Sequence, residues 1–293
     1  MIAPITIATP DQPFTALTWE PNPAQPSAHS ADKPPLLLLV HGFPDTPHSF
    51  RYQLEFFGDL GYRVIAPWLR GYAPSALAAD GNYSVTTLGN DLLQIMDALG
   101  YEQADVIGHD WGAGAAYAAA TITPERIDHL ITCALPYGPG LMQSMVTNGD
   151  QQRRSWYLFF FQTPLAEQAM VANDFALVKR LWREWAAPDW SPDETVITAV
   201  LECFNNAGSV EAALQYYRQV FSVPPPDQYR PIAVPTLTIH GEQDGCIGVE
   251  LATPDPAIFT GGCEYYRIAG AGHFVHLEKP GEFNHRVAEF IAA

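Results

Sequence analysis

Basic residues are scarce in this chain of 293 residues, which has 15 Lys and Arg against 32 Asp and Glu. The resulting formal net charge of −17 argues against nucleic acid or an anionic membrane as a partner, because both attract clustered Lys and Arg. The same acidic excess disfavours a strongly anionic substrate. The acidic excess mainly implies a soluble protein.

Several sequence features that would place the chain outside the cytoplasm are also missing. No run of about 18 apolar residues is present, so we expect no membrane span. Residues 1–14 lack the basic start and the long apolar core of a secretion signal, which favours a cytoplasmic protein. The four cysteines are scattered without a Cys-x-x-Cys pair and are expected to be buried or half-buried thiols, although their spacing leaves a disulfide open. No metal or nucleotide motif is present, so we predict no cofactor.

Hydrophobic residues make up 47% of the chain, enough for one large domain with an inserted subdomain. Short apolar runs predict strands near 5–8, 16–20, 36–40, 62–67, 104–107, 127–135, 236–240 and 264–268. Amphipathic or alanine-rich stretches between them predict helices at 49–60, 84–99, 111–120 and 280–291. Such alternation is typical of an α/β fold with a mostly parallel sheet, whose strands are buried on both faces.

The pattern changes between residues 136 and 226, which read as helices without core strands. We expect these helices to form a lid over the sheet, so that the α/β core comprises 1–135 and 227–293. Four local signals support helix starts in the chain: Ser84 as an N-cap, Pro164 at a first helical position, a capping box from Ser191 to Glu194, and Ser209 as an N-cap. Proline-rich loops at Pro21–Pro35 and Pro224–Pro226 flank these units.

The sequence Gly108-His109-Asp110-Trp111-Gly112 follows a predicted strand and precedes a predicted helix. This is the form of the turn that presents the nucleophile in α/β-hydrolases, where the central residue is usually Ser. Here it is Asp110, with glycine at both flanks to permit a sharp turn. A carboxylate is already deprotonated at neutral pH and can attack sp³ carbon, which leaves an ester on the enzyme. Alternatively, Asp110 would serve only as a helix N-cap.

Hydrolysis of that ester needs a base, and a His after the last strand is the natural candidate. His273 follows a run of small residues and is preferred over His276, three residues further on. The acid that orients it should follow the preceding strand, where Asp244 is preferred over Glu242. The order nucleophile, acid, His along the chain is that of the α/β-hydrolases.

The negative oxygen that forms during ester hydrolysis needs hydrogen-bond donors. Trp111, directly after Asp110, offers one amide. The loop His41-Gly42-Phe43-Pro44 after an apolar strand offers a second, which we assign to Phe43 because Pro44 has no N–H. Without such a role, the loop would be an ordinary tight turn.

Taken together, these motifs resemble the epoxide hydrolases of the α/β-hydrolase superfamily over nearly the whole chain. The resemblance implies two lid tyrosines that hydrogen-bond and protonate the epoxide oxygen. Tyr157 occupies the first position, shortly before Phe161-Gln162-Thr163-Pro164, and Tyr217 precedes Arg218 at the second. The alternative is that both are core tyrosines. One departure is Arg70-Gly71-Tyr72-Ala73-Pro74-Ser75, where the family often has Gly in place of Ala73.

The resemblance therefore implies an enzyme that opens a small apolar epoxide to a vicinal diol with water as co-substrate. Phe43, Trp111, Tyr157 and Tyr217 are the predicted substrate contacts. A haloalkane-type dehalogenase with the same Asp110 is the alternative, but a halide leaves without a proton and would not need the two phenols. A binding protein without activity on the same scaffold is a third possibility. We expect a monomer or a homodimer.

Overall fold

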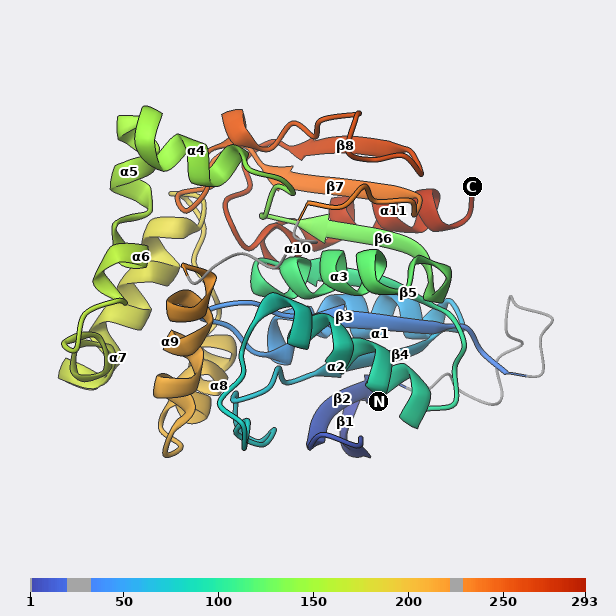
Figure 1. Cartoon of the computed structure of the whole chain (residues 1–293), viewed down its shortest axis with the longest axis horizontal. Helices are drawn as coiled ribbons and strands as arrows, with labels where there is room; N and C mark the ends of the chain where they lie inside the picture. The colour runs from blue at the N-terminus through green and yellow to red at the C-terminus, as the bar shows by residue number, and fades with distance from the viewer. Residues whose placement is uncertain (1, 20–32, 222–228) are drawn as a thin grey trace.

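The computed structural model describes residues 2–19, 33–221 and 229–293, and one mixed sheet runs through its centre (Figure 1). The strand order is β1-β2-β4-β3-β5-β6-β7-β8. The pairs β1–β2 and β2–β4 are antiparallel and all others are parallel. The strands are β1 (Ile2–Ala8), β2 (Pro13–Trp19), β3 (Leu36–Val40), β4 (Arg63–Pro67), β5 (Ala104–His109), β6 (Ile127–Cys133), β7 (Thr236–Gly241) and β8 (Cys263–Ile268).

Helices cover both faces of this sheet, as its continuous apolar strands require. Figure 1 shows α2 and α3 on one face and α1 and α11 on the other. The helices of this layer are α1 (Arg51–Asp59), α2 (Val85–Ala98), α3 (Trp111–Ile122), α10 (Val275–Glu278) and α11 (Pro280–Ile291), with short 3₁₀ turns η1 (Pro47–Phe50), η2 (Pro124–Arg126) and η3 (Val249–Leu251). Every residue of β3 and β5 is buried, so these two strands form the centre of the core.

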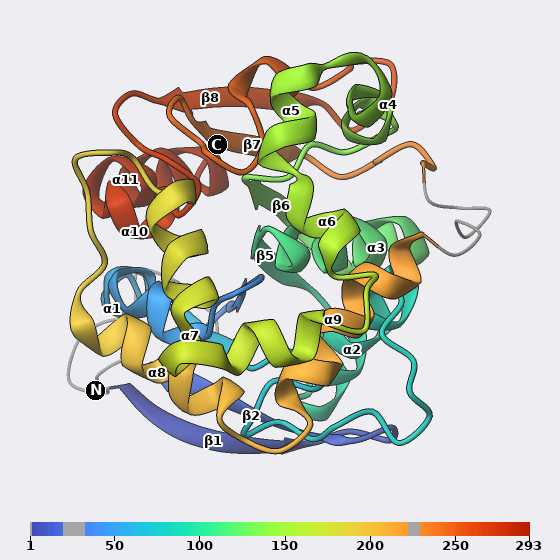
Figure 2. The ribbon, with the colours of Figure 1, turned by 90° about the vertical axis from the view of Figure 1, so that its left-hand side faces the viewer.

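The helices between β6 and β7 gather beside the carboxyl ends of the strands, at the left of Figure 1. Figure 2 looks onto this edge and shows them around the ends of β5 and β6. They are α4 (Gly140–Thr147), α5 (Gly149–Arg154), α6 (Trp156–Phe160), α7 (Ala166–Trp185), α8 (Glu194–Phe204) and α9 (Ser209–Val220). The predicted α/β class with an inserted helical lid is thus confirmed.

The residue bounds 1–135 and 227–293 for the core and 136–226 for the lid stay a prediction. Pro224–Pro226 and most of Pro21–Pro35 lie outside the described residues. No helix in the described ranges has both the length and the apolar character needed to cross a bilayer.

The capping box predicted from Ser191 to Glu194 is wrong. Asp193 occupies the N-cap of α8, and its side chain accepts hydrogen bonds from the amides of Thr195 and Val196. Ser and Asp are comparable N-cap residues, so the choice between them follows the path of the chain into the helix.

Two other predicted helix starts also differ from the structure. Gly208, not Ser209, is the N-cap of α9, and its left-handed backbone (φ 85°) suits glycine. The Ser209 hydroxyl instead accepts from the Ala73 amide at 3.3 Å, which ties the lid to the loop after β4. Pro164 does not begin a helix, because α7 starts two residues later at Ala166.

A turn of left-handed residues interrupts α7. Asn173, Asp174 and Phe175 have φ values of 52°, 56° and 55°, so the helix consists of two segments in different directions. The second segment carries Trp182 and Trp185, both fully buried, toward the carboxyl edge of the sheet. Beyond this bend, Trp182 donates to the Pro44 carbonyl in the loop after β3, and Trp185 packs against His273 in the loop after β8.

A buried ion pair joins the middle of α2 to the loop after β4. Nε of Arg70 donates to Asp91 at 2.6 Å, a second guanidinium nitrogen contacts the same carboxylate, and Nη1 donates to the Asn82 carbonyl at 2.8 Å. Both charged side chains are 3% exposed or less. Ser84 stands at the predicted N-cap, but its hydroxyl pairs with that of Thr87 and makes no capping bond.

We predict that Asp91→Ala lowers the free energy of unfolding by about 3–5 kcal/mol, because the buried Arg70 charge then keeps only the Asn82 carbonyl and the exposed Asp80 carboxylate at 4.0 Å. Urea unfolding followed by circular dichroism measures this. Asp150→Ala is the control, since its pair with Arg153 is 75–81% exposed and is expected to contribute no more than about 1 kcal/mol. Equal losses in the two variants would contradict the assignment.

Candidate active site

Asp110 stands between β5 and α3 with φ 51° and ψ −119°, a conformation that non-glycine residues rarely adopt. The two flanking glycines make this turn possible. A Cβ at Gly108 would lie 2.4 Å from the Gly112 carbonyl oxygen, and one at Gly112 would lie 2.0 Å from that of Val40. The turn therefore presents the carboxylate at the carboxyl edge of the sheet, where α/β folds usually place their sites.

The two oxygens of the Asp110 carboxylate have different neighbours. Oδ1 accepts a hydrogen bond of 2.8 Å from the amide of Phe43, which follows the adjacent strand β3. Trp111 begins α3, and its amide is one of the first-turn N–H groups that find no partner within a helix. Oδ2 is 3.7 Å from Nε2 of His273, too far for a hydrogen bond. One oxygen is thus held by the backbone, and the other faces the imidazole.

His273 and Asp244 form a buried pair beside this carboxylate. Nδ1 of His273 donates to Oδ2 of Asp244 at 3.0 Å, which turns Nε2 toward Asp110. The other oxygen of Asp244 accepts from the amides of Cys246 and Ile247 at 2.7 and 2.9 Å. These bonds fix the carboxylate, and through it the imidazole ring.

The charges at this site shift the pKa values of both partners. Burial alone would lower the pKa of His273, but the carboxylates of Asp244 and Asp110 outweigh it and raise the pKa to about 10. Burial alone would raise the pKa of Asp244, but the neighbouring His273 and the hydrogen-bond donors outweigh it and lower the pKa. His273 is therefore an imidazolium at neutral pH, paired with the ionised carboxylate of Asp244.

The competing residues from the sequence lie elsewhere. Nε2 of His276 is 3.1 Å from the hydroxyl of Ser49, and its ring stacks on Phe50. Glu242 is exposed and faces Arg267 at 3.7 Å. The structure thus places His273 and Asp244 beside Asp110, and neither competitor takes their place.

The two lid tyrosines and Asp110 line one cavity of about 270 Å³. Tyr157, from α6, is 4% exposed, and Tyr217, from α9, is 2% exposed. The Tyr217 ring centroid is 5.1 Å from those of Phe43 and Trp111. Burial raises the pKa of both phenols well above its usual value, so both are protonated at neutral pH.

Tyr216 and Tyr217 are adjacent, but their hydroxyl groups have different surroundings. The Tyr216 hydroxyl donates to the Arg70 carbonyl at 2.7 Å and is thereby used within the fold. The Tyr217 hydroxyl is buried and has no hydrogen-bond partner in the described ranges. Of the two, Tyr217 is therefore the residue that can donate to a molecule in the cavity.

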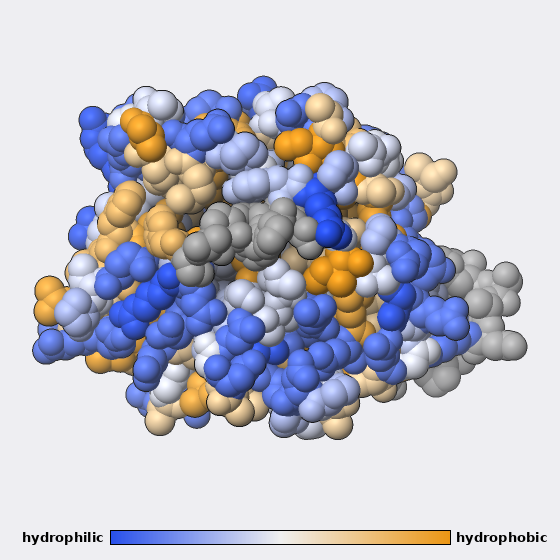
Figure 3. Space-filling view, viewed as in Figure 1, coloured by the Kyte–Doolittle hydropathy of each residue, from blue (hydrophilic) through white to orange (hydrophobic). Residues whose placement is uncertain are grey.

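Most of the cavity wall is apolar. It includes Leu135, Leu141, Met142, Val220 and Phe221. Met142 and Phe221 are 37% and 40% exposed, so the wall continues to the surface. Figure 3 shows apolar atoms among the hydrophilic ones over the lid helices at the left of the molecule. A cavity of this kind suits a ligand with an apolar body.

Three neighbours of the site were not identified from the sequence. Trp185 lies between His273 and Tyr157, with ring centroids at 5.2 and 4.9 Å. Glu278 is buried, and its carboxylate accepts hydrogen bonds from the amides of Ala187, Gly272 and Phe274. It joins the loop of His273 to the end of α7.

The third neighbour is Cys246, whose sulfur is 3.2 Å from the Tyr157 hydroxyl. A single sequence gives no signal for such contacts except the nearness of Cys246 to Asp244.

One group of side chains behind His273 has donors close enough to hold an ion. In the described part of the chain, Asp45, His109 and His276 are buried with ligand atoms within 4.8 Å of one another. Burial raises the pKa of Asp45 to about 7 and lowers that of His109 to about 3. The Ser49 hydroxyl already donates to Asp45 at 2.6 Å, so hydrogen bonds within the protein account for part of this cluster.

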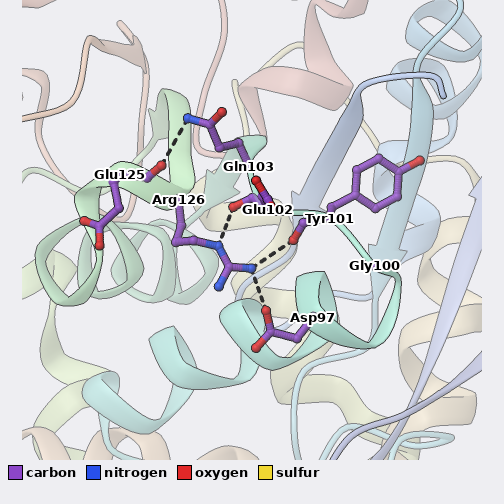
Figure 4. Close-up of a pocket in the computed structure, with 7 residues that line it drawn as sticks. All are labelled: Asp97, Gly100, Tyr101, Glu102, Gln103, Glu125 and Arg126. Carbon is purple, nitrogen blue, oxygen red and sulfur yellow. Dashed lines mark hydrogen bonds and ion pairs between the residues drawn. The ribbon is translucent and has the colours of Figure 1, made fainter. Parts of the chain in front are cut away.

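A second hollow lies at the opposite edge of the sheet, by the amino end of β5 (Figure 4). Its central side chain is Arg126, which donates to the Asp97 carboxylate at 2.6 Å and to the Tyr101 carbonyl at 2.9 Å. A third donation goes to the Glu102 carbonyl. The guanidinium therefore joins Arg126 to the end of α2 and the loop before β5. The hollow lies at the opposite edge of the sheet from Asp110.

Comparison with known proteins agrees with this geometry. Residues 35–280 match the family described as the alpha/beta hydrolase fold. The chain is 32% identical to human epoxide hydrolase 4 over 88% of its own length and 72% of the relative's. It belongs to the epoxide hydrolases of this fold. It is also 31% identical to epoxide hydrolase 1 of Caenorhabditis elegans over 89% of its length, and it spans 66% of that relative.

A solved structure supports the same family. The epoxide hydrolase of Bacillus megaterium, crystallised with an inhibitor, aligns with a TM-score of 0.81 and 26% identity, covering 99% of this chain and 100% of the other. The family resemblance seen in the sequence is confirmed.

We predict that Gly42→Ala lowers kcat/KM for epoxide hydrolysis about 100-fold. The added Cβ would lie 2.4 Å from both Cβ and Oδ1 of Asp110, and such a displacement of a reacting group has an effect of this size. Initial rates of diol formation measure it. Gly281→Ala, where nothing lies within 4 Å of the new Cβ, is expected to change the rate no more than about twofold. Full activity of Gly42→Ala would show that Asp110 does not need its observed position.

Proposed function

We propose that this protein hydrolyses apolar epoxides to vicinal diols through an ester on Asp110. The observation that carries the proposal is that one cavity brings together the Asp110 carboxylate and the phenols of Tyr157 and Tyr217. A carboxylate supplies a nucleophile for carbon, and phenols supply the acid that an epoxide oxygen needs as it leaves. The membership of the epoxide hydrolase family supports this chemistry.

In the first step, an oxygen of Asp110 attacks a ring carbon, and the carbon–oxygen bond of the epoxide breaks. Oδ2 is the attacking atom, because Oδ1 is held by the Phe43 amide. The electron pair of the broken bond stays on the epoxide oxygen, which takes a proton from a phenol. The product is a hydroxyalkyl ester of Asp110, in which the former epoxide oxygen is a hydroxyl group, and the phenol is left as a phenolate.

In the second step, His273 removes a proton from water, and the resulting hydroxide attacks the ester carbonyl carbon. Esterification removes one of the two carboxylate charges that raise the His273 pKa, so the imidazole can lose its proton and act as a base. Asp244 stabilises the imidazolium that forms again. The amides of Phe43 and Trp111 stabilise the negative carbonyl oxygen. As the tetrahedral intermediate collapses, the bond between the carbonyl carbon and the substrate oxygen breaks, and that oxygen takes the proton of the added hydroxyl group and leaves as the diol. Asp110 is then a carboxylate and His273 an imidazolium again, and the proton that His273 gave up before it acted as a base reaches the phenolate through solvent.

A haloalkane-type dehalogenase is the weaker alternative. It would use Asp110, His273 and Asp244 in the same way, but a halide leaves without taking a proton. Two buried phenols at the cavity would then have no chemical task. The apolar wall supports an apolar substrate in either case. The cytoplasmic location and the monomeric or dimeric state stay predictions from the sequence.

We predict that Tyr157→Phe with Tyr217→Phe lowers kcat/KM for styrene oxide by about 10²–10⁴-fold, since both acids for the leaving oxygen are lost. Diol formation by wild type and the double variant measures it. Halide release from a chloroalkane is followed in parallel. Halide release that survives in the double variant, with no diol formed by wild type, would replace the epoxide proposal with the dehalogenase.

A further inference from the structure

The two phenols at the cavity differ in what surrounds their oxygen atoms. The Tyr157 hydroxyl lies 3.2 Å from the sulfur of Cys246, within hydrogen-bond distance for a thiol. The Tyr217 hydroxyl has no hydrogen-bond partner in the part of the chain that the structure describes. Both side chains are buried, so hydrogen bonds to bulk water do not remove this difference between the two hydroxyl groups. Among the described residues, only the Tyr157 oxygen therefore has a neighbouring protein group that can hydrogen-bond to it when the phenol loses its proton.

Cys246 is placed between two parts of the site. Its amide donates to Asp244 at 2.7 Å, so its backbone belongs to the support of the triad acid. Its side chain is fully buried, not in a disulfide, and turned to Tyr157 on the lid. Burial raises the pKa of this thiol well above its usual value, so it remains an S–H group that can accept or donate a hydrogen bond.

Loss of a proton from a buried phenol leaves a charged oxygen in an apolar setting, which is unfavourable unless a donor is near. For Tyr157, rotation of the Cys246 S–H bond supplies such a donor without other movement. Aromatic rings surround both phenols, but the Tyr217 hydroxyl has no hydrogen-bond partner among the described residues; its ring lies 5.1 Å from those of Phe43, Trp111 and Phe161. A phenolate would thus be better stabilised on Tyr157 than on Tyr217.

We propose that Cys246 is a positioning residue for Tyr157, which makes Tyr157 the proton donor in ring opening. The thiol accepts a hydrogen bond from the phenol in the free enzyme and donates one to the phenolate as the epoxide oxygen takes the proton. No proton leaves the thiol. Tyr217 keeps its proton and orients the epoxide by a hydrogen bond. This inference rests on the proposed function, since it concerns the first of its two steps.

The experiment is a double-mutant cycle on the rate of ester formation. Single-turnover reactions with styrene oxide are quenched rapidly, and the ester on Asp110 is followed by intact mass. Cys246→Ala is expected to slow ester formation about tenfold, as loss of one hydrogen bond in the transition state would. The same substitution is expected to slow it about tenfold in Tyr217→Phe but less than twofold in Tyr157→Phe, because the thiol acts through Tyr157.

Two further readouts separate this role from a structural one. Cys246→Ala keeps the amide that supports Asp244, so the rate of ester hydrolysis is expected to stay unchanged, and Cys246→Ser is expected to restore part of the lost rate. Cys263→Ala, at a half-buried thiol on β8, is the matched control and is expected to behave as wild type.

An equal slowing by Cys246→Ala in the Tyr157→Phe background, or a loss confined to ester hydrolysis, would overturn the inference. Either result would leave the proposed function intact. By contrast, wild type that forms no ester and no diol would refute the proposed function itself.

Discussion

The left-handed backbone at Asp110 is the constraint on which the geometry of the site depends. A non-glycine residue with φ 51° and ψ −119° carries a cost of about 1–3 kcal/mol, which the surrounding structure has to offset. Strand β5 and helix α3 hold the two ends of the turn, and glycines on both sides remove the steric conflict. The carboxylate is thereby fixed at the edge where the loops after β3, β7 and β8 meet.

The charge balance around His273 follows from that position. Two carboxylates face one buried imidazole, and together they keep it protonated. In the proposed mechanism, His273 becomes a base only after esterification has removed the negative charge of Asp110. The contacts that keep His273 protonated in the free enzyme would then also set the order of the two steps. The lid completes the site, because α6 and α9 place the phenols of Tyr157 and Tyr217 in the wall of the cavity that Asp110 also lines. The edge of the sheet thus carries the charged pair of Asp244 and His273, and the lid carries the neutral phenols of Tyr157 and Tyr217.

The sequence predicted the features that depend on where strands end. Asp110 and His273 each follow a core strand, and the parallel sheet brings such positions to one edge. Features that depend on the direction of single side chains were not predictable in the same way. Asp193 and Ser191 are similar N-cap candidates, and only the path of the chain selects Asp193. The contact of Cys246 with Tyr157 spans 89 positions in the sequence and lies between core and lid, so no local pattern records it.

Trapping of the ester tests the central claim most directly. His273→Gln removes the base for the second step and leaves the carboxylate of Asp110 in place. Mixed with styrene oxide, this variant is expected to gain the mass of one epoxide, on the peptide that contains Asp110, while Asp110→Asn gains none. Absence of an adduct on His273→Gln with every epoxide that wild type hydrolyses would contradict the two-step mechanism.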